Sequence, residues 1–179
     1  MTLDQIDFGL VRHLQNNARM SNKELAAAVG LAPSSCHERT KRLWQEGVLR
    51  GAHAEVAPSV MGVGLEALLM IELAKHERQT VDSFMQEVVA IPEVRAAFLI
   101  SGRYDVIVHV VARDTAHLKD LALDQFTARP VVTRIETSII FEAAHRHDLP
   151  DLAGGVSPGD CNGVRCRAGR AIYTTQTVW

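Results

Sequence analysis

The stretch FLISGRYDVIVHVV, residues 98–111, decides the fold, because two apolar runs flank five residues that suit a turn. The runs have the length and the β-branched content of strands. The stretch therefore predicts a β-hairpin with strands at 94–101 and 105–112. Asn-Gly or Asp-Gly would suffice for a plain turn, so the segment Ser101-Gly102-Arg103-Tyr104-Asp105 carries more side-chain chemistry than a turn requires.

The elements on either side of this hairpin alternate between strand and helix. Residues 65–74 form an apolar strand pattern, and residues 80–89 repeat apolar side chains at helical spacing. A second helix, capped by Thr115, carries Leu118, Leu121, Ala122 and Phe126, and residues 131–141 complete the pattern as a strand. The order βαββαβ predicts an α+β, ferredoxin-like domain over residues 65–147.

Both faces of the expected sheet are apolar. In the strand at 105–112, Val106, Val108 and Val110 share one face, and Ile107 and Val111 share the other. Two helices cover only one face of such a sheet, so the second face requires another partner. An identical subunit in a two-fold dimer is the simplest partner.

The first 50 residues predict three helices with short turns. Thr2 is the expected N-cap of the first, and Ser21 with Glu24 forms a capping box for the second. Gly30 ends the second helix, and Pro33 suits the first turn of the third. This arrangement predicts a helix-turn-helix over residues 1–50. One or two short strands are expected at 48–56, and Pro58 with two glycines marks a hinge in the linker 51–64.

The two halves together resemble the Lrp/AsnC, or feast/famine, family of transcription regulators. The matching residues are Leu3-Asp4 with Asp7, Asn17-Ala18-Arg19, Glu24-Leu25-Ala26, Gly30-Leu31, Arg39, Lys41-Arg42-Leu43, Gly47-Val48 and the SGRYD hairpin. The resemblance covers residues 1–147 and implies a winged-type helix-turn-helix that binds double-stranded DNA. It also implies a ferredoxin-like domain that binds a free amino acid, and assembly into dimers and into an octamer of four dimers.

The third helix is the expected DNA-reading element. Cys36, Thr40 and Leu43 face inward at i, i+4 and i+7, so the rest of the helix faces outward or flanks the core. Small hydroxyls allow close approach to a groove, and Arg and Lys reach bases or phosphates. The candidate DNA-binding residues are Ser34, Ser35, His37, Glu38, Arg39, Lys41 and Arg42. Two alternatives stay open: His37 contacts DNA or covers Trp44, and Arg39 contacts DNA or braces the fold.

The hairpin is the expected effector site. Gly102 allows a ligand to approach the main chain, whose N–H groups bind a carboxylate, and Asp105 offers a charge for an ammonium group. The candidate residues are Ser101, Gly102, Arg103, Tyr104 and Asp105, with Thr137 and Ser138 as hydroxyl donors from the last strand. The alternative interpretation is a bare turn.

Composition bounds the remaining possibilities. The formal net charge is −2, so the basic residues Arg39, Lys41, Arg42 and Arg50 are a local cluster rather than a global bias. Three cysteines, an odd number, do not suggest a secreted disulfide framework. The N-terminal segment lacks the basic region of a signal peptide, which together with the absence of a long apolar run predicts a cytoplasmic protein that does not enter membranes.

Other sites are weighed against simpler explanations. Cys161 and Cys166, or His145 and His147 beside Glu142 and Asp148, have metal-ligand chemistry, but a loose tail and a solvated strand end explain them. We expect no metal, no cofactor and no catalytic residues. A small enzyme or its regulatory subunit, and an effector module whose helices contact protein, are the competing functions. The residues from 148 to 179 are glycine-rich and predict a loose tail.

Overall fold

The computed structural model describes residues 3–74, 77–146 and 148–150. The chain divides into two compact units, one built on the N-terminal helices and the other on a sheet, with the boundary between Ala54 and Glu55. The segment from Ala144 belongs to the first unit, where the Leu149 N–H donates to Gln15 Oε1 at 2.7 Å. Residues 151–179, with Cys161 and Cys166, and His147 lie outside the described residues.

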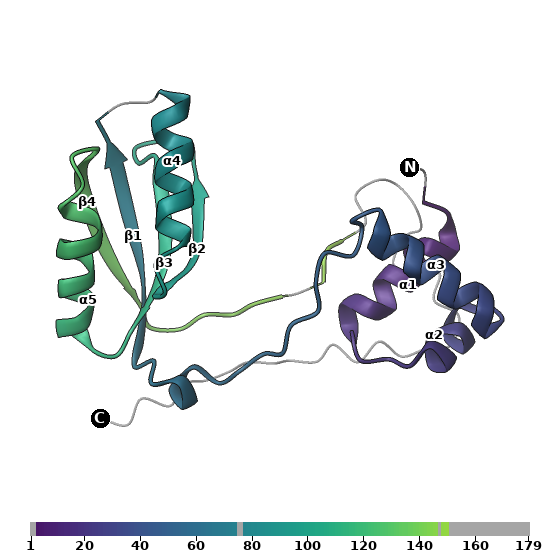
Figure 1. Ribbon diagram of the computed structural model, residues 1–179. Coiled ribbons are helices and arrows are strands. Elements are labelled where there is room, and N and C mark those ends of the chain that lie inside the picture. The colour runs from purple at the N-terminus through teal and green to yellow at the C-terminus, as the bar shows by residue number, and fades with distance from the viewer. Residues whose placement is uncertain (1–2, 75–76, 147, 151–179) are drawn as a thin grey trace. The chain divides into compact units, whose positions relative to one another are not determined.

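The first unit contains the three expected helices, α1 (Gln5–Asn16), α2 (Asn22–Val29) and α3 (Pro33–Gln45) (Figure 1). Local signals account for their ends. Ser21 and Glu24 form the predicted capping box of α2, and Gly30 ends that helix in the left-handed conformation at φ 70°. The cap of α1 is Asp4, in a second capping box with Asp7, and the expectation for Thr2 lies outside the described residues.

The core of the first unit forms where the three helices meet. Its fully buried members are Leu10, Leu25, Ala26, Cys36 and Leu43. The prediction that Cys36 and Leu43 face inward is confirmed, and the Thr40 hydroxyl oxygen is also buried. The opposite face of α3 is thereby left exposed.

The expectation of strands at 48–56 was wrong. Residues 51–57 have no regular structure, and the linker contains only the short 3₁₀ helix η1 (Pro58–Met61), which Gly62 ends at φ 76°. A strand needs a partner for its main-chain groups, and this segment has none within the described chain. The helix-turn-helix is therefore present here without paired wing strands.

The second unit is the predicted βαββαβ domain. Its strands are β1 (Leu65–Leu73), β2 (Val94–Leu99), β3 (Val106–Ala112) and β4 (Val132–Ile140). They form one sheet in the order β2-β3-β1-β4, with antiparallel pairing throughout. The central strands β1 and β3 pair from Leu65 opposite Ala112 to Ile71 opposite Val106. The SGRYD hairpin follows β2 after one intervening residue, Ile100, and leads into β3.

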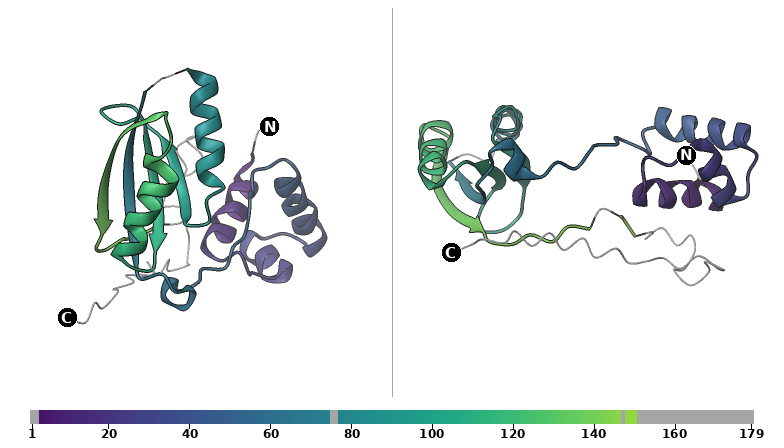
Figure 2. Two further views of the ribbon diagram at one scale, coloured as in Figure 1. Left: turned by 60° about the vertical axis from the view of Figure 1, so that its left-hand side comes forward. Right: turned by 90° about the horizontal axis from the view of Figure 1, so that it is seen from below.

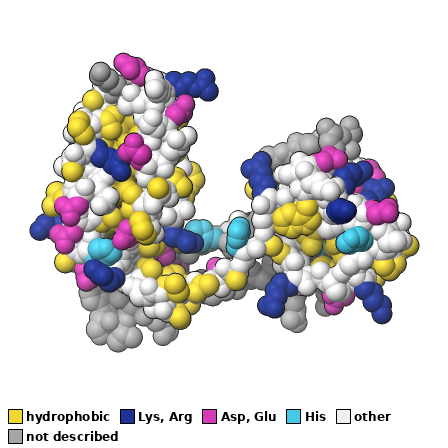
Figure 3. Space-filling view, in the orientation of Figure 1, with side chains coloured by type: hydrophobic (Ala, Val, Ile, Leu, Met, Phe, Trp, Pro, Cys, Tyr) yellow, Lys and Arg dark blue, Asp and Glu magenta, His cyan; other side chains and the backbone are white. Residues whose placement is uncertain are grey.

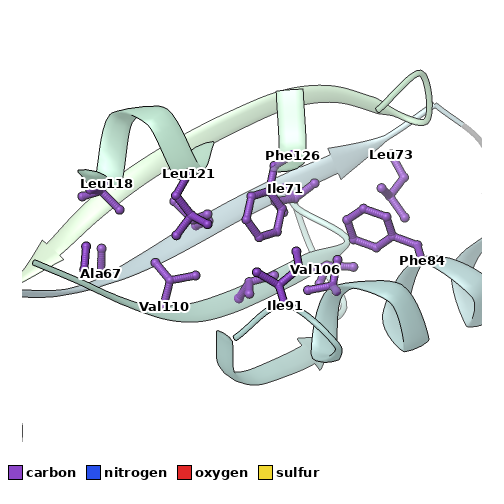
Figure 4. Close-up of a cluster of buried hydrophobic side chains, with 14 of the residues drawn as sticks. Ala67, Ile71, Leu73, Phe84, Ile91, Val106, Val110, Leu118, Leu121 and Phe126 are labelled. Carbon is purple, nitrogen blue, oxygen red and sulfur yellow. The ribbon is translucent and has the colours of Figure 1, made fainter. Parts of the chain in front are cut away.

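Two helical segments cover one face of this sheet (Figure 2). They are α4 (Arg78–Val89), and α5 (Thr115–Leu121) continued by the π-helix η2 (Ala122–Thr127). Phe84 and Phe126 pack between the helices and the strands (Figure 4). The N-cap of α5 is Asp114 rather than Thr115, because the Asp114 carboxylate accepts from the His117 N–H at 2.8 Å.

The uncovered face of the sheet is partly apolar, as the alternating strands predict. Leu68 and Met70 in β1 and Ile107 and Val111 in β3 are only half-buried, whereas their sequence neighbours on the helix side are fully buried. Phe98 is 53% exposed and pairs with Ile107 in the same layer. No helix in the described part of the chain is long and apolar enough to span a membrane.

Candidate nucleic-acid interface and effector site

The exposed face of α3 carries most of the expected DNA-binding side chains. Ser34, Ser35, His37, Glu38 and Lys41 are all exposed. Lys and Arg side chains lie at several places on the surface of this unit, with acidic side chains among them (Figure 3). The surface therefore offers a local basic helix rather than a uniformly positive face.

The N-terminus of α3 is open. Its N-cap residue, Ala32, makes no side-chain hydrogen bond to the helix. The first main-chain N–H groups of α3, at Ser34 and Ser35, therefore lack a side-chain cap, and such groups suit an anionic phosphate. The Asn22 side chain donates to the Pro33 carbonyl at 2.7 Å and so ties the start of α2 to the start of α3. This bond holds the α2–α3 turn in place.

The two arginines of α3 both contact acidic side chains at the start of α1. Arg42 Nη2 lies 2.7 Å from Asp7 Oδ2, and Arg39 Nη1 lies 3.0 Å from Asp7 Oδ1 and 2.6 Å from Asp4 Oδ2. The sequence placed Arg42 outward or flanking the core, and its exposed side chain extends along the flank, where the guanidinium contacts α1 through Asp7. For Arg39 the bracing alternative has a direct contact to support it.

The contacts of the capping residue Asp4 lower the pKa of its carboxyl group. The main-chain N–H of Asp7 and the Arg39 guanidinium both hold the pKa of the Asp4 carboxyl below its ordinary value. The carboxylates of Asp4 and Asp7 raise the pKa of Arg39. Sequence reasoning found the acids and the arginines but missed their connection. The signal was present, since each pair is spaced i, i+3 and so shares one helix face.

The second candidate site, the hairpin, exposes its main chain. Ile100 N–H donates to the Asp105 carbonyl at 2.9 Å and closes the loop. Among the described contacts, the N–H groups of Ser101, Gly102 and Arg103 donate to no protein acceptor. Gly102 has φ 129°, and no atom lies within 4 Å of the place its Cβ would take. The glycine therefore adopts a backbone conformation that other residues rarely adopt, and the loop presents donors in an open space.

The Asp105 carboxylate is partly committed within the protein. Its Oδ2 accepts from the Leu73 N–H at 2.8 Å, and its own N–H donates to the Ile71 carbonyl at 2.9 Å. The residue therefore ties the hairpin to the end of β1. If the Asp105 carboxylate also binds the ammonium group of an effector, it does so while accepting the hydrogen bond from the Leu73 N–H.

A charged cluster that the sequence did not reveal lies beside the hairpin. Glu136 on β4 pairs with Arg134 at 2.7 Å and with Arg103 at 3.7 Å. The Arg103 guanidinium lies 5.3 Å from the centre of the Tyr104 ring. The Glu136 carboxylate raises the pKa of the Tyr104 phenol, although within the described part of the chain no hydrogen bond of standard geometry reaches the buried phenol oxygen. Tyr104 in turn, followed by both arginines, lowers the pKa of Glu136.

The two hydroxyl donors proposed from β4 do not share a face. Ser138 pairs with Leu68 on the uncovered side, whereas Thr137 pairs with Leu69, which points toward the helices. Successive strand residues point to opposite faces, so the two hydroxyls cannot line one pocket on the same side. Ser138 alone shares the uncovered face with Glu136.

Comparison with known proteins agrees with this two-unit architecture. Residues 66–149 match the Lrp/AsnC ligand binding domain, and residues 3–50 match the winged helix-turn-helix DNA-binding family. The transcriptional regulator AldR of Mycolicibacterium smegmatis is 37% identical over 140 residues, which cover 78% of this chain and 82% of AldR. The chain belongs to the Lrp/AsnC family. It is a helix-turn-helix transcription regulator, and the enzyme alternative is set aside.

Two further similar proteins are named for, or were solved with, an amino acid. The leucine-responsive regulatory protein of Rhizobium meliloti is 32% identical over 137 residues, which cover 76% of this chain and 88% of that protein. A transcriptional regulator of Neisseria meningitidis, solved as a complex with L-Met, superposes with a TM-score of 0.76 at 29% identity. That comparison covers 83% of this chain and 97% of the other.

Proposed function

We propose that this Lrp/AsnC regulator reads DNA with α3 and adjusts its DNA affinity or assembly to a free amino acid bound at the SGRYD hairpin. The observation that carries the effector site is the hairpin main chain: the N–H groups of Ser101, Gly102 and Arg103 have no acceptor among the described residues, and Gly102 has φ 129°. Such a nest of donors suits a carboxylate. The family domain and the L-Met complex of a related regulator support the amino-acid class.

The ammonium group of the effector needs a negative partner. Asp105 and Glu136 are the two carboxylates placed at the hairpin. Asp105 already accepts from Leu73, and Glu136 already pairs with two arginines, so each would share its charge with the ligand. We therefore assign the ammonium contact to either carboxylate and the α-carboxylate to the loop N–H groups.

The DNA contact is assigned to the exposed residues Ser34, Ser35, His37, Glu38 and Lys41, whereas Arg39 and Arg42 are paired with the acids of α1. Ser34 and Ser35 sit at the open helix N-terminus, where phosphate contacts are favoured. Lys41 lies two turns further along α3 and reaches a base edge or a second phosphate.

Assembly completes the proposal. A second copy of the chain covers the partly apolar sheet face, because exposed apolar surface of this kind favours association. The face is formed by Leu68, Met70, Phe98, Ile107 and Val111. An effector bound at the hairpin would then lie near the neighbouring subunit. An effector changes DNA affinity only if it binds one state of the assembly better than another. Larger rings of four dimers are proposed from the family resemblance.

Two measurements test this function. A thermal-shift screen with the twenty common amino acids, followed by calorimetry on any that stabilise the protein, tests the effector. A salt series on DNA binding tests the nucleic-acid role, since a regulator loses affinity log-linearly as salt competes for phosphates. If no amino acid binds, the hairpin is not an effector site, while the assignment of α3 to DNA binding is unaffected. If the chain has no affinity for DNA, the assignment of α3 to DNA binding is wrong.

A further inference from the structure

Asp7 is the one buried charged side chain of the described residues, at 1% exposure. It lies in the first turn of α1, and its carboxylate receives the Asp4 N–H at 3.2 Å, Arg39 at 3.0 Å and Arg42 at 2.7 Å. A buried carboxylate is costly unless it is paired and hydrogen-bonded, and here both oxygens are engaged. The pairing connects helices α1 and α3 across 32 and 35 residues of sequence.

The geometry of the pairs fixes α3 more tightly than apolar packing alone. Asp4 and Asp7 are one helical turn apart at the start of α1, and Arg39 and Arg42 are one turn apart on α3. Arg39 contacts both acids while Arg42 contacts only the buried one. Three directional bonds between two rows of side chains restrict rotation of α3 about its axis and sliding along it.

The bonds also determine where the positive charge of α3 lies. Arg42 is 44% exposed, so the guanidinium remains accessible from solvent while one of its nitrogens is held by Asp7. Lys41 is exposed and has no ion pair among the described contacts. Among the described contacts, Lys41 is therefore without an ion pair, whereas Arg39 and Arg42 are held by the acids of α1.

We propose that Asp7 is a positioning residue for DNA recognition, which acts through Arg39 and Arg42. It sets the rotation at which α3 presents Ser34, Ser35 and Lys41 to DNA, and it withholds Arg42 from contacts with phosphates of any sequence. Phosphate contacts give affinity without sequence information, whereas base contacts need a fixed register. Loss of the Asp7 charge lowers specific binding and leaves non-specific binding equal or stronger. This inference rests on the proposed placement of α3 on DNA.

The test compares two duplexes. One is selected from a random-sequence pool by the wild-type full chain, and the other is a shuffled duplex of the same composition. Asp7→Asn keeps the size and removes the charge. Its affinity for the selected duplex should fall about tenfold or more, the scale of a lost base contact. Its affinity for the shuffled duplex should stay or rise, with a salt slope steeper by about one.

The control is Glu46→Gln, the same charge change in the same unit at the exposed C-cap of α3. It should change the affinities for the two duplexes by the same factor and so leave the ratio of the two affinities unchanged. Adding Arg42→Gln to Asp7→Asn removes the released arginine, so the shuffled duplex should return to its wild-type affinity while the selected duplex stays weak. This double variant distinguishes two causes of stronger non-specific binding: a guanidinium of Arg42 that is no longer held by Asp7, and a general loosening of the fold.

Several results overturn the inference. One is an unchanged ratio of the two affinities in Asp7→Asn, and another is an equal fall of both that follows a lower melting temperature, which marks a merely structural role. If Asp7→Asn does not fold, Arg42→Ala is measured, because it leaves Asp7 paired with Arg39 but removes the second contact between Asp7 and α3. An unchanged affinity of that variant for the selected duplex also overturns the inference. Failure of the wild-type chain to select any duplex instead removes the proposed DNA role.

Discussion

The Asp105 carboxylate accepts a hydrogen bond from the Leu73 main-chain N–H at 2.8 Å. The β1–β3 pairing ends at Ile71 opposite Val106, so this side chain extends the ladder beyond the last strand pair. Asp105→Ala leaves a donor unpaired beside the buried Leu73 side chain and should cost about 1–3 kcal/mol in the free energy of unfolding, as measured by urea denaturation. Asp105→Asn retains an acceptor oxygen and should cost less. Equal stability of Asp105→Ala and wild type contradicts the structural role.

The second prediction concerns Gly102, whose φ of 129° is rarely adopted by other residues. Gly102→Thr meets no atom within 4 Å, so its effect arises from backbone strain and from a side chain over the exposed N–H groups. Calorimetry should show loss of the amino-acid binding detected in the wild-type screen. Gly62→Thr is the matched control, because Gly62 also has a positive φ, 76°, and open surroundings, but lies in the linker. Equal affinities for wild type and Gly102→Thr leave the hairpin as a turn.

Local signals explain why much of the fold was predictable. Ser21 with Glu24 and Gly30 determine helix ends through their own main-chain contacts, so no distant residue is needed to place them. The valine alternation of β3 determines its buried face for the same reason. The strands expected at 48–56 failed because β structure depends on a pairing partner that a local pattern does not supply.

The candidate sites depended on distant contacts and were less predictable. Asp7 and Arg42 are 35 residues apart in the sequence. Their ion pair forms only because α1 packs against α3, and the helical pattern of α3 alone does not reveal it. Strand alternation alone assigns Thr137 and Ser138 to opposite faces, so the sequence could have shown that they do not line one side of the sheet together. Arg134 and Glu136 share a face by the same rule, and their proximity to Arg103 depends on where the hairpin folds.

The third prediction tests the uncovered sheet face. Ile107→Glu places a charge beside Met70 and Phe98 and should convert the proposed dimer into a monomer. The free-energy cost of burying an unpaired carboxylate exceeds the free energy gained from the apolar contact. Sedimentation at micromolar concentration measures the change. Ala116→Glu, on the exposed surface of α5, is the control and should leave assembly unaltered. A wild-type chain that sediments as a monomer refutes this interface without any mutation.

The fourth prediction uses the buried Thr40 hydroxyl, which has no hydrogen-bond partner among the described residues. Thr40→Val keeps the β-branched shape and removes the unsatisfied oxygen. It should raise the free energy of unfolding by about 1 kcal/mol without changing DNA affinity. Thr133→Val is the comparison, since that hydroxyl donates to the Glu72 carbonyl at 3.0 Å and its removal should not stabilise the protein. A destabilised Thr40→Val contradicts the absence of a partner.

The last prediction concerns acid stability of the helix-turn-helix. The pKa of Asp4 is lowered, first by the Asp7 N–H and then by Arg39, from an ordinary value of 3.8. The pKa of Glu24 is lowered by the Ser21 side chain and then by its N–H, from an ordinary value of 4.5. A carboxyl whose pKa is lower in the folded state contributes its full stability above the unfolded value, and this contribution disappears as the pH falls through the folded value. Both contributions are therefore complete at neutral pH and are lost below about pH 4.

Helix unfolding followed by circular dichroism between about pH 2 and pH 6 should show this loss in the wild-type chain. Asp4→Asn and Glu24→Gln should each be less stable than wild type at neutral pH. Each should also depend less steeply on pH below its ordinary carboxyl value, because the titrating group is gone. Asp82→Asn, which removes an exposed carboxylate of α4 paired only at 3.6 Å with Arg78, should leave the acid transition of α1–α3 unchanged. Parallel acid curves for wild type and Asp4→Asn would show that the capping carboxylate of α1 does not contribute.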